Sequence, residues 1–177
     1  AGVDWVTVAC PSKVGWAVHA LSADLVVKKF SGKHFTLSHT KKLLALEKDF
    51  DAVLIGNGIG IKASKMVKSF VKRSKKPLVV DADGVKAISL QDVSNGILTP
   101  HKGEFKQLLK NSKLALDGFE KNLGRNVLVL KGAVDTIYVD GKKLYNKTGN
   151  PGMTKAGTGD VLAGLCLGFL GQGLSLR

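Results

Sequence analysis

A glycine-rich segment near the carboxyl end carries the strongest chemical signal in the chain. Gly157, Thr158 and Gly159 directly precede an apolar segment, 161–170, of helical character. Consecutive small residues at the start of a helix let several backbone N–H groups point at one anion, and the helix dipole adds to the attraction. The pattern therefore predicts a site for a phosphoryl group or a similar anion.

Asp160 follows this segment immediately. A carboxylate would repel a static phosphate, but it is useful where it removes the proton from a hydroxyl group that attacks phosphorus. An aspartate in the first turn of a helix also interacts favourably with the helix dipole without any catalytic role. The Gly-Thr-Gly segment before Asp160 and the small residues after it favour the catalytic interpretation.

A second glycine-rich loop contains Gly56, Gly58 and Gly60 and follows an apolar run. Such a loop, with Asp81 about 20 residues further on, is typical of dinucleotide-binding proteins. The dinucleotide fingerprint, however, needs a glycine where Ile61 stands, and the loop does not lie in the first unit of the fold. A hydride-transferring Rossmann protein is therefore disfavoured, whereas close approach of the backbone to a ligand explains the glycines better than a simple turn.

Several polar side chains after other apolar runs have a structural and a functional explanation each. Asp81 and Asp83 suit a magnesium ion or an ordinary turn equally well. His101 suits a helix cap or a ligand contact, and Glu104 lies on the same side of that helix. Lys131 suits a phosphate counter-charge or a solvated surface.

These loops share one location if the chain is an α/β protein. Short apolar runs alternate with amphipathic segments, which is typical of a mostly parallel central sheet with helices on both faces, a three-layer α/β/α sandwich. In such a sheet ligands bind beyond the carboxyl ends of the strands, where each of these loops falls.

The elements are predicted from apolar periodicity and turn residues. The predicted strands are 3–9, 24–30, 52–56, 78–81, 97–99 and 127–131, with a hairpin of 136–139 and 144–145 around Asp140-Gly141. The predicted helices begin near Ser12 (with Val14, Val18 and Leu21 facing inward), Ser38, Ala63, Pro100, Leu114 (to Leu123) and Gly159, and a further short helix follows the strand 78–81.

Length and composition fit one domain. The chain has 177 residues, of which 44% are hydrophobic, and we treat residues 1–177 as a single domain. A strand of buried type begins at residue 3 and the last helix stops soon after Gln172, so we expect the domain to be incomplete at both ends. No apolar stretch reaches the roughly 20 residues that span a bilayer, and no secretory signal is present, so we expect a cytoplasmic protein without membrane contact.

The net charge of +13, from 27 Lys and Arg against 14 Asp and Glu, favours polyanionic partners. Only three of the cations are arginines, and no RNA-binding or zinc-finger motif accompanies them. Phosphorylated small molecules are therefore favoured over nucleic acid, although a non-enzymatic module with a basic binding surface stays an alternative.

Five motifs together resemble one known family. GNGIG, VVDADG, LTPHKGEF, VLKGAVDT and GNPGMTKAGTGDVLAG occur in the order seen in the ADP-dependent NAD(P)H-hydrate dehydratases, the YjeF carboxy-terminal domain family of the ribokinase-like superfamily. The resemblance spans nearly the whole chain. Hydroxyethylthiazole kinases and sugar kinases share the GTGD-type ending but are less similar at TPHKGEF.

The resemblance implies a repair reaction and its partners. The hydrates of NADH and NADPH would be dehydrated while ADP is cleaved to AMP and phosphate, with Mg²⁺ as cofactor. The hydroxyl group would be phosphorylated first, and elimination of phosphate would restore the dihydronicotinamide. The family also implies a homo-oligomer and an epimerase partner, either a fused domain or a separate protein. A superfamily kinase acting on a small alcohol such as hydroxyethylthiazole is the alternative.

The resemblance also implies residue roles. Asp160 would be the base, and the backbone of Gly157, Thr158 and Gly159 would stabilise the phosphoryl group in transfer. Glu104 would hold magnesium through water. Substrate contacts would come from Gly58, Gly60, His101 and Asp160, and nucleotide contacts from Lys131, Gly132, Ala133, Val134, Asp135 and Gly159.

Overall fold

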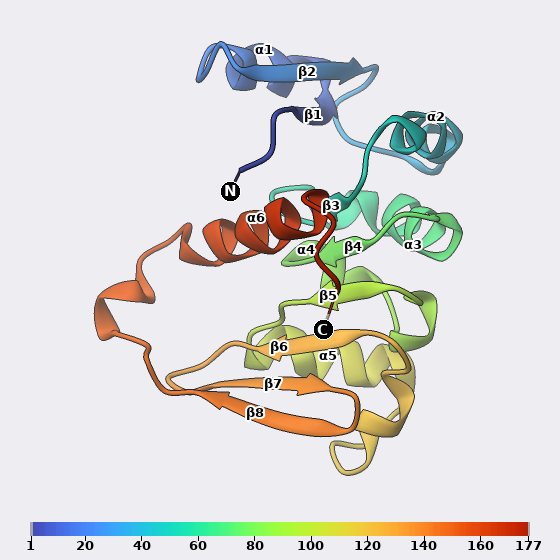
Figure 1. The fold of residues 1–177 in the computed structure, drawn as a ribbon. Helices are drawn as coiled ribbons and strands as arrows, with labels where there is room; N and C mark the ends of the chain where they lie inside the picture. The colour runs from blue at the N-terminus through green and yellow to red at the C-terminus, as the bar shows by residue number, and fades with distance from the viewer. Residues whose placement is uncertain (1, 177) are drawn as a thin grey trace.

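Two β-sheets form the frame of the molecule in the computed structural model, which describes residues 2–176 (Figure 1). The larger sheet has six strands in the order β3-β4-β5-β6-β7-β8, and the smaller sheet pairs β1 with β2. Strands β3 to β6 are parallel, β7 and β8 are antiparallel, and β1 and β2 are parallel to each other. The strand bounds are β1 Val6–Pro11, β2 Leu25–Phe30, β3 Val53–Ile55, β4 Leu78–Val80, β5 Gly96–Leu98, β6 Val127–Leu130, β7 Asp135–Val139 and β8 Lys142–Asn146.

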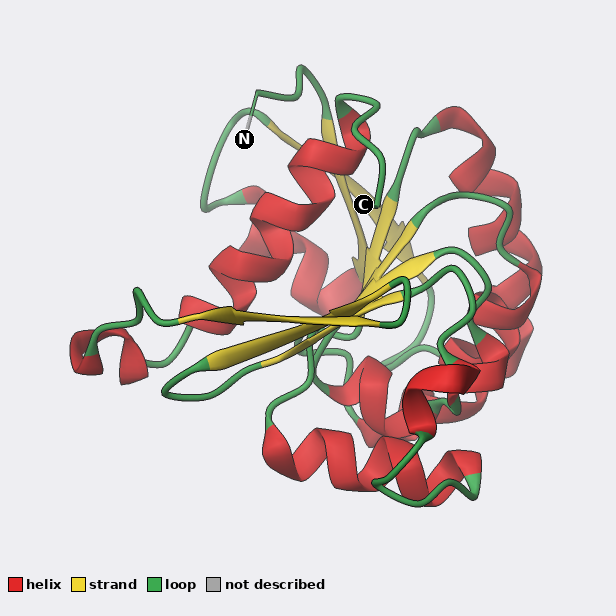
Figure 2. Ribbon diagram, turned by 60° about the horizontal axis from the view of Figure 1, so that its bottom comes forward, coloured by secondary structure: helices red, strands yellow, loops and turns green. Residues whose placement is uncertain are grey.

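Helices cover both faces of the six-stranded sheet (Figure 2). The α-helices are α1 Ser12–His19, α2 Thr40–Leu46, α3 Ser64–Arg73, α4 Asp83–Ala87, α5 Lys102–Ser112 and α6 Thr158–Gly171. Short 3-10 helices lie at Leu37–His39, Glu47–Asp49, Ile61–Ala63, Leu90–Asp92, Phe119–Asn122 and Pro151–Thr154. Across residues 2–176 no helix is both long and apolar enough to cross a membrane.

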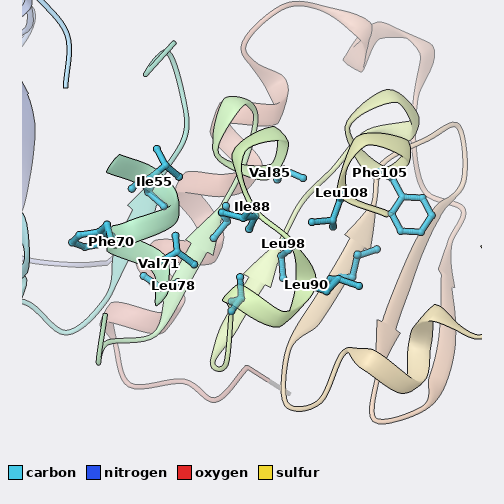
Figure 3. Packing of buried hydrophobic residues seen from close by; sticks show 14 of the residues in the cluster. Ile55, Phe70, Val71, Leu78, Val85, Ile88, Leu90, Leu98, Phe105 and Leu108 are labelled. Carbon is cyan, nitrogen blue, oxygen red and sulfur yellow. The ribbon is translucent and has the colours of Figure 1, made fainter. Parts of the chain in front are cut away.

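Strand β4 shows why the central strands consist of apolar residues instead of alternating apolar and polar ones. Successive side chains of a strand point to opposite faces, and both faces are covered here. Leu78 and Val80 belong to the main core cluster, which includes residues of α3, α4 and α5 (Figure 3). Val79 lies on the other face and packs with Ala163 and Leu170 of α6. The sheet is therefore the middle layer of an α/β/α sandwich, as the sequence predicted.

A buried carboxylate ties α3 to the 3-10 helix Leu90–Asp92. The Asp92 side chain accepts hydrogen bonds from the Ser89 backbone N–H and hydroxyl, both at 2.8 Å, and pairs with Lys72 at 3.1 Å and Lys68 at 3.4 Å. Burial by itself raises the pKa of Asp92, but the Ser89 hydrogen bonds and the two ammonium groups outweigh it, so that the net pKa is lowered.

The predicted inward face of the first helix is wrong for two of its three residues, whereas Val18 is half-buried. Val14 is 48% exposed and Leu21 is 80% exposed, while the buried residue of α1 is Gly15. A Cβ atom on Gly15 would lie 2.5 Å from the Lys29 Cγ, so the helix approaches β2 at this glycine. The β1–β2 sheet has two strands and lies along one side of α1 (Figure 1), so it covers only part of the surface of this helix.

Two further predictions of helix extent are corrected. The predicted helix 114–123 is a 3-10 helix, Phe119–Asn122, because Gly118 before it has the left-handed conformation, φ +81°. Helix α5 begins at Lys102 after the cap residue His101, so Pro100 lies outside the helix. The strands and the hairpin of β7 and β8 agree with the predicted ranges to within a few residues.

Candidate active site

The loops that follow the parallel strands meet at one edge of the six-stranded sheet, as expected for the carboxyl ends of its strands. Hydrogen bonds join the loop after β3 to the loop after β4 and to α6. Thr99, after β5, and Lys131, after β6, both reach the same carboxylate after β4. Segments far apart in the sequence therefore form a single polar cluster.

Asp81 is the centre of this cluster. Its side chain is 3% exposed, and one oxygen, Oδ1, accepts hydrogen bonds from the Thr99 hydroxyl and the Lys131 ammonium, each at 2.8 Å. The other oxygen, Oδ2, accepts from the Asn57 amide at 3.0 Å. Asp81 is therefore a buried carboxylate whose oxygens are occupied by three donors from three loops, and its carbonyl oxygen accepts from the Gly84 N–H at 2.9 Å in the turn after β4.

Asn57 joins this buried centre to Asp160. Its Nδ2 donates to Asp81 and also to the Asp160 Oδ1, at 2.5 Å, across 103 positions of the sequence. The Asn57 Oδ1 is buried and has no hydrogen-bond partner within the described structure. An unsatisfied buried acceptor costs about 1–3 kcal/mol. Sequence reasoning missed Asn57; the available signal was a polar residue between two glycines after a buried strand.

The start of α6 has the properties of an anion site. Gly157, with φ +94°, is the cap residue and provides no side-chain hydrogen bond to the first turn, as expected of a glycine. The Lys131 Nζ lies 3.2 Å from the position that a Cβ atom on Gly159 would occupy. The positive end of the helix dipole and a lysine ammonium thus lie together beside Asp160. Thr158 faces the other way, because its hydroxyl donates to the carbonyl oxygens of Met153 and Lys155.

His101 and Glu104 form a capping box at the start of α5. The His101 Nδ1 accepts from the backbone N–H of Gly103 at 2.9 Å and of Glu104 at 3.3 Å, and the Glu104 Oε2 accepts from the His101 N–H at 3.0 Å. The His101 side chain is 58% exposed, so the ring is accessible as well as structural. A parallel bridge between His101 and Lys131 places this cap next to the polar cluster.

The surroundings of Glu104 do not fit a metal ligand. Its side chain is 5% exposed; one oxygen holds the backbone, while Oε1 lies 3.4 Å from the His101 Nε2 and 3.9 Å from the Lys86 ammonium. Positive or N–H-bearing groups thus face both oxygens, which leaves neither free to coordinate Mg²⁺ directly, whereas the sequence predicted a contact through water. Within residues 2–176 no three His, Cys, Asp or Glu side chains gather into a possible metal site.

The remaining predicted residues lie in two exposed turns. Gly132, Ala133 and Val134 form the exposed part of the turn between β6 and β7, and Asp135 anchors it by accepting from the Gly132 N–H at 3.0 Å. Gly58 and Gly60 have positive φ angles of +63° and +78°, and space is open around both. The Gly60 N–H already donates to Asp83 at 3.1 Å, which gives Asp83 a structural role.

Gly56 brings the two loops after β3 and β4 into direct contact. A Cβ atom at Gly56 would lie 1.9 Å from the Asp81 carbonyl oxygen and 2.7 Å from the Gly84 nitrogen. Backbone therefore packs on backbone here, which only a glycine permits. This contact fixes Asn57 and Asp81, the residues that follow β3 and β4, relative to each other.

The layered sheet, together with a glycine-capped helix start beside a lysine ammonium and a carboxylate, is that of a ribokinase-like protein. A ribokinase-like superfamily protein from Enterococcus faecalis has a solved structure with a TM-score of 0.75 and 27% identity, covering 95% of this chain and 61% of that one. Hydroxyethylthiazole kinase from Pyrococcus horikoshii is similar in fold alone, with a TM-score of 0.56 at 17% identity, covering 95% of this chain and 72% of that one.

Sequence comparison narrows the class to one family. The family model described as NAD(P)H-hydrate dehydratase matches residues 1–176, and the chain belongs to that family. The bifunctional NAD(P)H-hydrate repair enzyme Nnr of Methanothermobacter thermautotrophicus is 34% identical, over 99% of this chain and 37% of its own length. The ADP-dependent (S)-NAD(P)H-hydrate dehydratase of Haloterrigena turkmenica is 33% identical, over 87% of this chain and 59% of its own length. The family predicted from the five motifs is thus confirmed, and the chain spans 37% and 59% of the length of these two relatives.

Proposed function

We propose that this chain provides the catalytic domain, residues 1–177, of an ADP-dependent dehydratase that acts on the hydrates of NADH and NADPH. The proposal rests mainly on the position of Asp160, which lies at the start of α6 beside the Lys131 ammonium. The match of the family model to residues 1–176 supports it. A base next to an anion site is what transfer of a phosphoryl group to a hydroxyl group requires.

In the proposed reaction Asp160 takes the proton from the hydroxyl group of the hydrate. The hydroxyl oxygen bonds to the β-phosphorus of ADP, and the bond from that phosphorus to the bridging oxygen breaks to release AMP. Phosphate then leaves with the hydroxyl oxygen, a proton leaves the neighbouring atom, and the dihydronicotinamide ring is restored. The oxygen atom of the eliminated water thus ends in phosphate. Its two hydrogens are released as protons, one by way of Asp160 and one from the ring atom beside the C–O bond.

The other predicted residues receive roles that fit their surroundings. The backbone of Gly157, Thr158 and Gly159 and the Lys131 ammonium would stabilise the transferred phosphoryl group. The exposed turn Gly132, Ala133 and Val134, anchored by Asp135, would contact the nucleotide. Gly58, Gly60 and the exposed His101 ring would contact the hydrate.

We derive no step through magnesium, because the donor set around Glu104 does not suit it. The homo-oligomer, the epimerase partner and the cytoplasmic location remain predictions from the sequence. The positive net charge of +13 suits two ligands that both carry phosphates, so the proposal needs no nucleic-acid partner. The small-alcohol kinase alternative has the support of fold alone.

The test is recovery of absorbance at the reduced nicotinamide band when NADH hydrate, ADP and magnesium are added. We expect recovery with the wild-type protein and a loss of about 10²–10⁴-fold in kcat with Asp160→Asn, the range for removal of a general base. Asp117→Asn, in an exposed loop, is the matched control and should leave the rate unchanged.

Nucleotide binding is followed separately by thermal unfolding, since a ligand that binds only the folded protein raises Tm. No recovery of absorbance, combined with protection by ADP, would overturn the dehydratase proposal and leave the kinase alternative. Neither recovery nor protection, with salt-sensitive binding of DNA or RNA, would favour the basic binding module instead.

A further inference from the structure

We propose that Asn57 is a positioning residue that holds the Asp160 carboxylate in place by connecting it to the buried Asp81–Lys131 ion pair. The inference rests on the proposed role of Asp160 as the base. It assigns a function to a residue that contacts neither the nicotinamide nor the nucleotide in the proposed scheme.

The Asp160 side chain has little else to hold it. The residue is exposed, and among the hydrogen bonds of residues 2–176 its carboxylate takes part in the one from Asn57. A free aspartate on a helix surface exchanges between staggered rotamers, and a single strong hydrogen bond selects one of them. Removal of the Asn57 amide would therefore leave the carboxylate free to move away from the start of α6.

Asn57, in contrast, is itself fixed from inside the protein. Its second amide hydrogen goes to Asp81 at 3.0 Å, and Asp81 is held by Thr99 and Lys131 at 2.8 Å each. Asn57 also directly follows Gly56, whose backbone is packed against the loop after β4. A continuous series of contacts thus runs from the buried end of the cluster to the exposed carboxylate.

The chemistry of the position selects an asparagine. Two carboxylates can be joined only by a group with two hydrogens to donate, and the side-chain amide supplies both from one nitrogen. An aspartate of the same size would add a third negative charge and donate nothing. The Asn57 Oδ1 stays buried without a partner as a result. Unsatisfied buried groups in native proteins call for an explanation, and here the amide is oriented for the two carboxylates.

The experiment is a double-mutant cycle on the dehydratase reaction with Asn57→Ala and Asp160→Asn. We expect Asn57→Ala to lower kcat by about 10²-fold, the loss associated with a misplacement of about 1 Å, while the KM for ADP changes by less than about 3-fold. In the Asp160→Asn protein, Asn57→Ala should cause no further loss, because the group that it positions is already absent.

Asn111→Ala is the matched control. The Asn111 amide likewise bridges two acceptors, the carbonyl oxygens of Lys86 and Ile88 at 2.9 and 2.8 Å, but it lies on α5 away from the cluster. This variant should lower Tm and leave kcat unchanged. If Asn57→Ala is unfolded at the assay temperature, Asn57→Leu, which keeps the size and adds no charge but loses both donors, takes its place.

The outcomes separate the two proposals. Wild-type kcat in a folded Asn57 variant, or the same fold-loss in the wild-type and Asp160→Asn backgrounds, would overturn the positioning role and leave the proposed function standing. An Asp160→Asn protein with wild-type activity would overturn the proposed role of Asp160 itself. A loss confined to the background with Asp160 intact supports both.

Discussion

Gly56→Ala gives a sharp test of the packing that holds the site together. The ideal Cβ atom would lie 1.9 Å from the Asp81 carbonyl oxygen, whereas Cβ atoms in proteins essentially never approach another heavy atom within 3.0 Å. The carbonyl would have to move by more than about 1 Å. That carbonyl accepts the Gly84 N–H at 2.9 Å, so its movement breaks the turn after β4.

The size of the effect follows from two contributions. Gly56 has φ +129°, where a residue with a side chain is strained by about 1–3 kcal/mol. Overpacking against backbone adds about 1–3 kcal/mol. We therefore expect Gly56→Ala to lower the free energy of unfolding by about 4 kcal/mol, the middle of the summed range, and to lower Tm by roughly 10 °C.

Gly58→Ala is the control within the same loop. Gly58 also has a positive φ angle, +63°, but nothing lies within 4 Å of its Cβ position. Gly58→Ala should lower the free energy of unfolding only by the cost of the left-handed conformation, about 1 kcal/mol. Urea unfolding followed by circular dichroism measures both variants. An equal decrease in the free energy of unfolding for the two variants would refute the reasoning. The backbone conformation alone would then explain the effect of Gly56→Ala, without the contact with the Asp81 carbonyl.

Two other predictions concern buried charges. Lys131→Met should destabilise the protein by about 3 kcal/mol, because it leaves the buried Asp81 carboxylate without its cation; urea unfolding at pH 7 tests this, and a loss below about 1 kcal/mol would show that Asp81 needs no counter-ion. The pKa of Asp92 is lowered from 3.8, so its contribution to stability is present above that pH and is lost as the pH falls through the lower folded-state value. Asp92→Asn should therefore show a smaller loss of stability below about pH 4 than the wild type, and identical pH profiles would contradict the assignment.

Much of the fold and the catalytic candidate were predictable from local sequence. Apolar runs of strand length alternate with amphipathic segments, and both faces of the central strands are buried, so β4 reads as Leu-Val-Val without alternation. The Gly-Thr-Gly segment before Asp160 is local too, because a helix start and its dipole involve only neighbouring residues. The order of the five motifs then indicated the family, which the family model confirms.

Other features were not predictable, because they depend on which surfaces meet. The apolar spacing predicted an amphipathic first helix that included Leu21, but α1 ends at His19, and the two-stranded sheet beside it leaves Val14 exposed. The predicted helix 114–123 is interrupted by the left-handed backbone conformation of Gly118, which the apolar spacing did not reveal. For His101 the sequence left a helix cap and a ligand contact open, and only the hydrogen bonds of His101 and Glu104 to each other's backbone show the capping box.

The sequence by itself determined most of the elements, the glycine-rich start of α6 and the family, since each depends on residues that are close together in the chain. The tertiary structure decided the partners of the charged groups. Asp160 meets Asn57 across 103 positions, and Asp81 meets Lys131 across 50. Such hydrogen bonds depend on the order of the strands and on the path of each loop, because the carboxyl ends of parallel strands converge only after the sheet has formed.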